Sequence, residues 1–303
     1  MTDRQEKRID SLREAGFRGE IVAECSLAPY TTWRIGGAAE LLASPRDVPD
    51  LLTALRWASQ KHVPWRVLGN GSNLLIGDDG VRGLVLRIRR VLDDVRLDGP
   101  SIDAGAGASF PAVSRLAATH GLAGLEFGAG IPGTLGGAVV MNAGWHEHEI
   151  GNVVREVRFV ESDLTLGRYD REACRFGYRD SVFRHRRGIV LGATLELERG
   201  DPAELRQRLE HFAASRKTSQ PTDLPSCGSV FLKPPGDFAG RLIDEAGLKG
   251  LRVGDIEVST KHANFFVNLG RGTAADVLAL VERVEREVEQ RFGVRLVREF
   301  EQW

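Results

Sequence analysis

The stretch GLEFGAGIPGTLGGAVVMNAG (residues 124–144) combines seven glycines with a largely apolar background. Ordering so many glycines in a loop is entropically unfavourable unless another group packs on the chain. Gly128, Gly130 and Gly133 match the spacing G-x-G-x-x-G, but the preceding apolar run is short and Pro132 lies inside the pattern, which argues against a Rossmann fingerprint. The stretch instead predicts a main-chain cradle for a large planar cofactor.

A second glycine-rich segment, VLGNGSNLLI (67–76), has an apolar run on each side of a tight turn. Successive main-chain N–H groups in such a turn can form a nest that binds an anion such as a pyrophosphate. Asn-Gly is also a strong signal for a plain β-hairpin, so this segment alone leaves both interpretations open.

The composition is that of an ordinary globular protein. The chain has 303 residues, 42% hydrophobic and 27% charged, with a net charge of -1. There is no basic excess to favour nucleic-acid binding, and no apolar run of membrane-spanning length or signal-peptide core is evident. The three cysteines are far apart in the sequence, which is typical of free thiols in a reducing compartment. We therefore expect a cytoplasmic protein with no membrane or nucleic-acid partner, and no obligate protein partner is evident.

Capping and periodicity signals predict four helices. The first has Ser44 as its predicted N-cap and Pro45 in its first turn, and the others begin at Ser109, at Asp201-Pro202 and after Thr273; the second ends at Gly121 and the fourth at Gly293. Short apolar runs predict strands at 65–68, 83–88, 101–104, 153–162, 188–198, 229–233, 263–269 and 294–300. This order of elements indicates an α+β fold without internal repeats, with boundaries near residues 90 and 203.

Two further segments contain candidate functional side chains. FGYRDSVFR (176–184) places Arg179 between aromatic residues, where it could bind a carboxylate or phosphate, or form a structural pair with Asp180 in a surface turn. PSCGSVFLKP (225–234) places Ser229 behind a glycine, which is also how an ordinary strand begins. The pair His146 and His148 lacks a clear third ligand, so we expect no metal site.

Taken together and in order, these segments resemble the UDP-N-acetylenolpyruvoylglucosamine reductase family. The matching stretches are TTWRIGG (31–37), VLGNGSNLLI (67–76), residues 124–144, FGYRDSVF (176–183), RKTSQP (216–221), PSCGSVF (225–231), AGLKG (246–250), KHANFFVN (261–268) and a C-terminal glutamate, Glu299. They extend over nearly the whole chain. No loop insertion follows the Tyr-Arg motif, so the chain resembles the short-loop type.

The resemblance implies a two-part FAD-binding region of the vanillyl-alcohol-oxidase type followed by a smaller α/β substrate-binding domain. With our boundaries, this gives FAD-binding subdomains at 1–90 and 91–202 and a substrate-binding domain at 203–303. It implies non-covalent FAD, NADPH as hydride donor and a nucleotide-sugar substrate whose enolpyruvyl group is reduced to give UDP-N-acetylmuramate for peptidoglycan. An attachment residue for covalent FAD is absent from 67–76, which contains no His or Cys.

The resemblance also implies roles for individual residues. Arg179 and Glu299 match residues that stabilise the anionic intermediate, and Ser229 matches the proton donor. The expected cofactor-binding residues are Arg34, Gly69, Asn70, Gly71, Ser72, Asn73, Gly130, Pro132, Gly133, Thr134 and Gly137. The expected substrate-binding residues are Asn142, Tyr178, Lys217, Lys233, His262 and Asn264.

The sequence departs from the family pattern at Leu232-Lys233-Pro234, where Lys-Asn-Pro is usual, and Lys233 either binds the substrate diphosphate or faces solvent. Cys227 is a rival to Ser229 as the proton donor, because a thiol is the stronger acid; we favour Ser229. The alternative functions are a paralogous flavoprotein with another substrate, such as an oxidase, and a non-catalytic binder of FAD or a nucleotide sugar.

Overall fold

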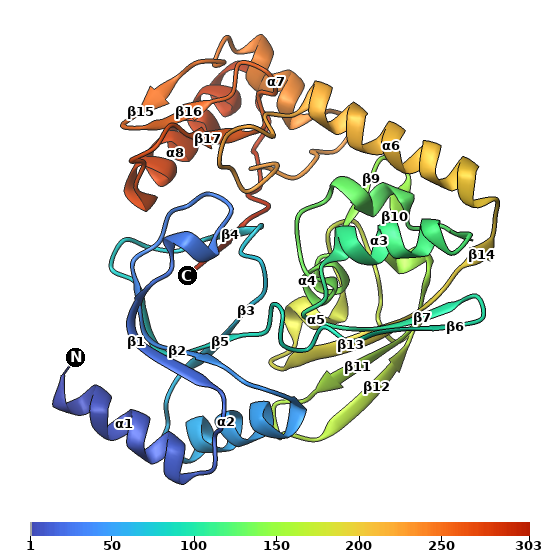
Figure 1. Ribbon diagram of the computed structural model, residues 1–303. Helices are drawn as coiled ribbons and strands as arrows, with labels where there is room; N and C mark the ends of the chain where they lie inside the picture. The colour runs from blue at the N-terminus through green and yellow to red at the C-terminus, as the bar shows by residue number, and fades with distance from the viewer. Residues whose placement is uncertain (1) are drawn as a thin grey trace. The chain divides into compact units, whose positions relative to one another are not determined.

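The computed structural model describes residues 2–303 and divides into two compact units (Figure 1). The first unit holds residues through Ala23, Leu41–Asn70 and Gly83–Ser215. The second holds Glu24–Glu40, Gly71–Arg82 and Arg216–Trp303. Each unit is therefore built from separated pieces of the chain. The division expected at residues 90 and 202 is a different, contiguous partition, and it stays a prediction.

The first unit contains a five-stranded sheet with the order β12-β11-β13-β7-β6. Its strands are β6 (Val95–Asp98), β7 (Ser101–Gly105), β11 (Val154–Val160), β12 (Leu166–Asp170) and β13 (Ile189–Glu196), all paired antiparallel. Its helices are α1 (Asp3–Glu14), α2 (Val48–Gln60), α3 (Phe110–Thr119), α4 (Leu135–Val140), α5 (Val182–His185) and most of α6 (Pro202–Ser219). Helices α3 and α4 lie on one side of the sheet (Figure 1). They bury Phe110, Leu135 and Val139 in one hydrophobic cluster with strand residues such as Ile102 and Leu195.

A four-stranded sheet has the order β1-β2-β5-β3. Its strands are β1 (Glu20–Ser26), β2 (Ala38–Ser44), β3 (Trp65–Leu68) and β5 (Val81–Arg87). Strand β3 pairs parallel with β5, and helix α2 connects β2 to β3. Leu51, Leu55 and Trp57 of α2 pack with Leu84 and Leu86 in a second cluster.

The second unit has a small antiparallel sheet beside a long helix. Its elements are β4 (Leu74–Leu75), α7 (Ala239–Glu245), β15 (Arg252–Val253), β16 (Ile256–Val258), β17 (Phe266–Asn268), α8 (Ala274–Phe292) and β18 (Glu301–Gln302). Strand β18 pairs parallel with β4. The buried stripe of α8 includes Val277, Val281 and Val284, and it packs with Phe231 and Phe266 in the core of this unit.

The first unit also contains two short antiparallel strand pairs. They are β8 (Leu122–Ala123) with β14 (Glu198–Arg199) and β9 (Gly144–Trp145) with β10 (His148–Glu149).

Local signals predicted two helices well. Helix α8 begins after Thr273, whose side chain and Asp276 form a capping box, and it ends at left-handed Gly293. Helix α3 begins after Ser109 and is followed by Gly121 with φ +67°. The predicted cap of α2 at Ser44 is wrong: Ser44 ends strand β2, and Asp47 caps the helix by accepting from Asp50 N.

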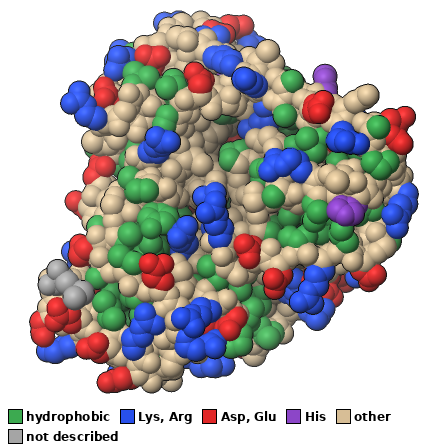
Figure 2. Space-filling view, in the orientation of Figure 1, with side chains coloured by type: hydrophobic (Ala, Val, Ile, Leu, Met, Phe, Trp, Pro, Cys, Tyr) green, Lys and Arg blue, Asp and Glu red, His purple; other side chains and the backbone are tan. Residues whose placement is uncertain are grey.

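Two predicted strands do not form as regular strands. Residues 229–233 and 294–300 make only isolated bridges, Ser229 with Phe265 and Phe231 with Arg298. Each segment is held by a few main-chain hydrogen bonds rather than by a continuous ladder. Within residues 2–303, no helix combines the length and the apolar character that crossing a membrane requires. On the visible face, acidic and basic side chains are interspersed (Figure 2).

Candidate active site

The loop between β3 and β4 has free main-chain donors. Within residues 2–303, the N–H groups of Gly69, Asn70, Gly71 and Ser72 donate to no protein acceptor. Adjacent N–H groups without protein partners are what an anion nest requires. The loop therefore suits the pyrophosphate of a dinucleotide such as FAD. Of the two interpretations of VLGNGSNLLI, these free donors favour the anion nest over the plain hairpin.

The two glycine-rich segments meet inside the first unit. A Cβ on Gly69 would lie 2.8 Å from the Oγ1 atom of Thr134, the residue that caps α4. On the other side of the cap, a Cβ on Gly136 would lie 2.8 Å from the Cβ of Ala106. Side chains at these two glycines would force the chain segments apart. The Thr134 side chain accepts from Gly137 N, while Gly130, Pro132 and Gly133 precede the cap and are at least partly exposed.

The TTWRIGG segment lies against the same loop in the second unit. The N–H of Thr32 donates to the carbonyl of Gly71 at 3.0 Å. Gly71 has φ +58°, and a Cβ there would lie 2.4 Å from the carbonyl oxygen of Tyr30. Arg34 is exposed and has φ +57°, a left-handed conformation that is uncommon for arginine. These close approaches fit a cofactor held by main chain, and the residues present fit FAD.

Arg179 lies at the tip of a tight turn in the first unit. Gly177 and Asp180 exchange main-chain hydrogen bonds of 3.0 and 3.1 Å, which leaves Tyr178 and Arg179 at the tip. Arg179 has φ +54°, and one of its guanidinium nitrogens donates to the carbonyl of Gly144 at 2.8 Å. Strained residues of this kind are concentrated at functional sites. Tyr178 is 52% exposed and its ring lies 5.4 Å from the Arg179 guanidinium carbon.

Ser229 and Glu299 are on neighbouring chain segments of the second unit. The main-chain N–H of Glu299 donates to the carbonyl of Val230 at 2.8 Å, and Val230 N donates to the carbonyl of Asn264. Gly228 has φ +86° with open space where a Cβ would be, so the turn conformation, and not crowding, requires glycine. Both candidate side chains are partly exposed. These main-chain hydrogen bonds therefore bring the segments of the predicted proton donor and the predicted acidic residue next to each other.

Cys227, the rival donor, is buried in the core of the second unit with 5% exposure. Burial raises the pKa of its thiol well above the ordinary value, and the nearby Glu299 carboxylate raises it further. A thiol in this environment is protonated but shielded from solvent, whereas Ser229 is partly exposed. The geometry favours Ser229.

Two predicted substrate-binding asparagines have their carboxamides occupied within the protein. Asn142 is 1% exposed; its Nδ2 donates to Glu149 Oε2 at 2.7 Å and to Gly177 O at 2.9 Å, and its Oδ1 accepts from Gly151 N. Asn264 is 7% exposed, and its carboxamide both accepts from the N–H and donates to the carbonyl of Phe231. Both asparagines therefore brace their own units, and their expected role in substrate binding stays a prediction.

The remaining predicted substrate-binding residues lie in the second unit. Lys217 is exposed near the end of α6, and its carbonyl accepts from Lys261 Nζ at 2.5 Å. The ammonium of Lys233 lies 4.4 Å from the centre of the exposed Phe238 ring. His262 Nδ1 accepts from Asn264 N, and burial lowers the pKa of its imidazole. A neutral ring whose Nδ1 is an acceptor carries its proton on Nε2 and can donate from there.

Sequence reasoning missed two supporting contacts. Asn73, expected to bind the cofactor, also donates through Nδ2 to the carbonyl of Glu299 and so holds the C-terminal segment. Glu149 had no recognised role, yet it accepts from Asn142. Neither contact has a local signal, because the partners are 226 and 7 residues apart in the chain.

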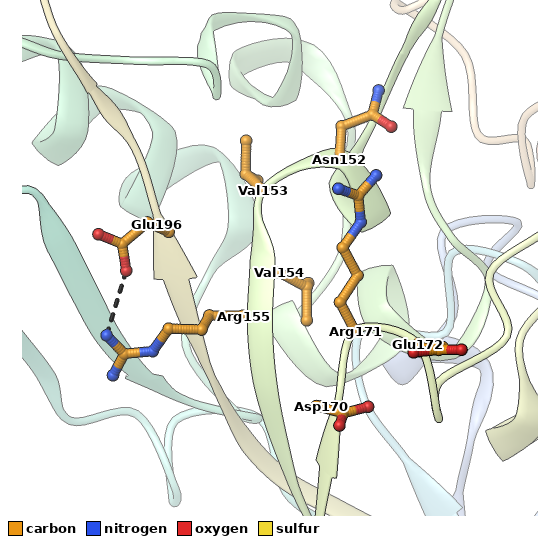
Figure 3. A pocket seen from close by; sticks show the side chains of 8 residues that line it. All are labelled: Asn152, Val153, Val154, Arg155, Asp170, Arg171, Glu172 and Glu196. Atoms are coloured by element: carbon orange, nitrogen blue, oxygen red, sulfur yellow. Dashed lines mark hydrogen bonds and ion pairs between the residues drawn. The ribbon is translucent and has the colours of Figure 1, made fainter.

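Other surface features contain none of the predicted residues. A shallow depression around β11 is lined by Asn152, Val153, Val154, Arg155, Asp170, Arg171, Glu172 and Glu196 (Figure 3). Within it, the exposed side chains of Arg155 and Glu196 form an ion pair at 3.1 Å. In residues 2–303 no cluster of three His, Cys, Asp or Glu side chains could hold a metal ion.

Comparison with known proteins first defines the class. The family profile described as "FAD binding domain" matches residues 39–167. This segment contains both glycine-rich loops that meet at Gly69 and Thr134. The chain is therefore a flavoprotein by fold, which confirms the expected FAD cofactor and the expected α+β fold class.

The second profile, described as the C-terminal domain of UDP-N-acetylenolpyruvoylglucosamine reductase, matches residues 220–303. The enzymes of that name from Heliobacterium modesticaldum and Rubrobacter xylanophilus are 45% and 48% identical to this chain, over 92% and 89% of its length and 90% and 91% of theirs. The crystal structure of the Thermus caldophilus reductase superposes with a TM-score of 0.81 at 40% identity, covering 94% of this chain and 99% of that one. The chain belongs to the UDP-N-acetylenolpyruvoylglucosamine reductase family, as its motifs predicted.

Proposed function

We propose that this protein catalyses the NADPH-dependent reduction of the enolpyruvyl group of UDP-N-acetylglucosamine-enolpyruvate to give UDP-N-acetylmuramate, a peptidoglycan precursor. The observation that carries the proposal is the 45% identity to a reductase of that name over 92% of the chain. The retention of Arg179, Ser229 and Glu299 in a structure that exposes each of them in part supports it.

FAD, when bound, supplies the two-electron chemistry that carries hydride from NADPH to the terminal carbon of the enolpyruvyl group. We assign the free N–H groups of residues 69–72 to its pyrophosphate. Donors that are fixed before the ligand arrives bind an anion without further ordering of the chain. Close packing at Gly69 and Gly71 keeps those donors in place.

Hydride addition to the terminal carbon leaves negative charge on the adjacent carbon, which spreads into the substrate carboxylate. Arg179 can pair with that carboxylate through its planar guanidinium. Glu299 can donate a hydrogen bond to the developing anion only as the protonated acid. Donors fixed toward developing charge in a site that excludes water are a large source of rate enhancement.

Ser229 then delivers a proton to the carbon that bears the charge, which completes the addition of one hydride and one proton across the double bond. A hydroxyl is a weak acid, so it acts only if it is positioned directly at that carbon. The bridge between Ser229 and Phe265 fixes the main chain at the donor. Lys233 is assigned to the substrate diphosphate, where lysine acts as a point charge.

The steady-state assay is NADPH oxidation with and without the enolpyruvyl substrate. The proposal predicts a yellow protein that releases flavin into the supernatant on acid precipitation and oxidises NADPH continuously only when substrate is added. Substrate-independent NADPH oxidation coupled to oxygen would indicate an oxidase. A colourless protein that binds a nucleotide sugar would indicate a non-catalytic binder.

A further inference from the structure

The Arg179 turn is braced by Arg184, which donates to the carbonyl of Arg179, and by the region of one neighbouring hairpin, β9–β10 with Asn142 just before it. The left-handed conformation of Arg179, at φ +54°, costs roughly 1–2 kcal/mol for a residue other than glycine. Such a conformation persists only where the surroundings determine it. The main-chain bonds between Gly177 and Asp180 close the turn but do not connect it to the rest of the unit.

Asn142 supplies that connection. Its Nδ2 donates to the carbonyl of Gly177, the same oxygen that accepts from Asp180 N across the turn. Its second Nδ2 hydrogen bond is to Glu149, and its Oδ1 accepts from Gly151 N at 2.9 Å. Three hydrogen bonds at 1% exposure leave the carboxamide a single orientation.

The same hairpin also holds the guanidinium. Gly144, whose carbonyl accepts from Arg179, pairs in register with Glu149 in the β9–β10 ribbon. The packing around the carboxamide is close, because a Cβ on Gly151 would lie 2.8 Å from the Asn142 Oδ1 atom. The Gly177 carbonyl of the turn is therefore held by Asn142, just before the ribbon, and the Arg179 guanidinium by Gly144 within it.

We propose that Asn142, oriented by Glu149, is a positioning residue for Arg179: it fixes the carbonyl of Gly177 and thereby the left-handed turn that presents the guanidinium to the substrate carboxylate. The inference rests on the proposed function only for what Arg179 does. The bracing of the turn follows from contacts within the first unit.

The direct test measures the turn itself in the purified holoenzyme. Amide hydrogen exchange reports local opening of the chain. Asn142→Ala should speed exchange of the Gly177 and Asp180 amides. Ser114→Ala, a matched control that removes another buried hydrogen bond in the same unit, to Phe110 O at 3.0 Å, should leave those amides unchanged. Unchanged exchange in Asn142→Ala would overturn the proposal, whatever reaction the protein catalyses.

A kinetic cycle then tests the coupling to Arg179, with the unmodified protein as its reference. Asn142→Ala should slow reoxidation of the reduced flavin by the enolpyruvyl substrate on the order of 10- to 100-fold, as expected for a misplaced group, and leave reduction by NADPH within about twofold. Adding Asn142→Ala to Arg179→Ala should slow reoxidation no further, because the residue it positions is already gone. Equal slowing of both half-reactions, or an additive loss in the double variant, would overturn the proposal.

Glu149→Gln keeps the test decisive if Asn142→Ala does not fold. It weakens only the contact that orients the Asn142 carboxamide. It should slow reoxidation by a few-fold in the presence of Arg179 and have no effect in Arg179→Ala. No effect in either background would contradict the proposal. Failure of the unmodified protein to reduce the substrate at all would instead refute the proposed function and leave the exchange result standing.

Discussion

The Arg179 turn and the Ser229–Glu299 pair position their side chains by different means. The turn holds Arg179 in a strained conformation with hydrogen bonds from side chains, among them Asn142 to Gly177 O and Arg184 to Arg179 O. The segments of Ser229 and Glu299 are held by main-chain bridges and by hydrogen bonds from Asn264 and Asn73, and their left-handed position is occupied by a glycine, Gly228. We infer that the turn, whose left-handed residue bears a side chain, is the more sensitive of the two regions to changes at its bracing residues.

The largest expected effect in the bridged segments is that of the proton donor. Ser229→Ala should slow reoxidation of reduced flavin by the enolpyruvyl substrate by about 10³-fold, within the range of general acid catalysis, with near-normal reduction by NADPH. Ser229→Cys should recover part of the rate, since a thiol can donate. Rapid-mixing kinetics of the two half-reactions measures both.

Cys227→Ala is the control for that assignment, because this thiol is buried and its pKa is raised. It should leave reoxidation within a few-fold of the parent rate. Normal turnover in Ser229→Ala together with its loss in Cys227→Ala would reverse the assignment and make the thiol the acid.

The next largest effect concerns Glu299. Glu299→Ala should slow reoxidation by about 10²-fold, comparable to the loss of one donor to a developing anion. Reduction by NADPH should stay near normal, because Glu299 is assigned to the substrate half-reaction. The main-chain bond from Glu299 N to Val230 O is unaffected by the substitution, so the melting temperature should change little. Equal slowing of both half-reactions would indicate a structural role.

A smaller effect is expected at Gly71 in the cofactor loop. There, a matched pair of glycine substitutions distinguishes steric crowding by a new Cβ from backbone strain at positive φ. Gly71→Ala places a Cβ 2.4 Å from Tyr30 O, so it should weaken FAD binding by about tenfold or more. Gly16→Ala is the matched control, since Gly16 also has positive φ, +95°, but open space around it. It should lower stability by roughly 1 kcal/mol and leave FAD affinity unchanged. Flavin fluorescence during titration of each stripped variant measures its FAD affinity. Equal affinities for Gly71→Ala and Gly16→Ala would contradict the nest.

The smallest expected effect is at Lys233. Lys233→Ala should raise the substrate KM by up to about fivefold with little change in kcat, since an exposed ionic contact contributes about 1 kcal/mol or less. Lys7→Ala, which removes an exposed ion pair with Asp3 on α1, serves as the control and should change neither constant. An unchanged KM in Lys233→Ala would leave Lys233 as a solvent-facing residue stacked on Phe238.

The sequence predicted what depends on local chemistry. Helix α8 has its cap, its apolar stripe and its terminal glycine within 21 consecutive residues from Thr273 to Gly293, and α3 has comparable signals. The family motifs gave the FAD-binding class and the positions of Arg179, Ser229 and Glu299.

Other features depend on contacts between distant residues, which one sequence does not show. The resemblance implied substrate contacts for Asn142 and Asn264, and the sequence did not show that each also satisfies main-chain groups inside its own unit. Helix α2 is capped by Asp47 and not by the predicted Ser44. The buried Asp50 carboxylate accepts from the N–H groups of Arg18 and Arg46, and this fixes the chain just before the helix. The assignment of 24–40 and 71–82 to the second unit has no local signal at all.

A single-turnover experiment tests the central claim most directly. The flavin of the unmodified holoenzyme is reduced with one equivalent of NADPH without oxygen, and the enolpyruvyl sugar nucleotide is then added. We predict that the visible absorption of oxidised flavin returns and that one equivalent of UDP-N-acetylmuramate forms. Flavin that stays reduced until oxygen is admitted, with the sugar nucleotide recovered unchanged, would contradict the account.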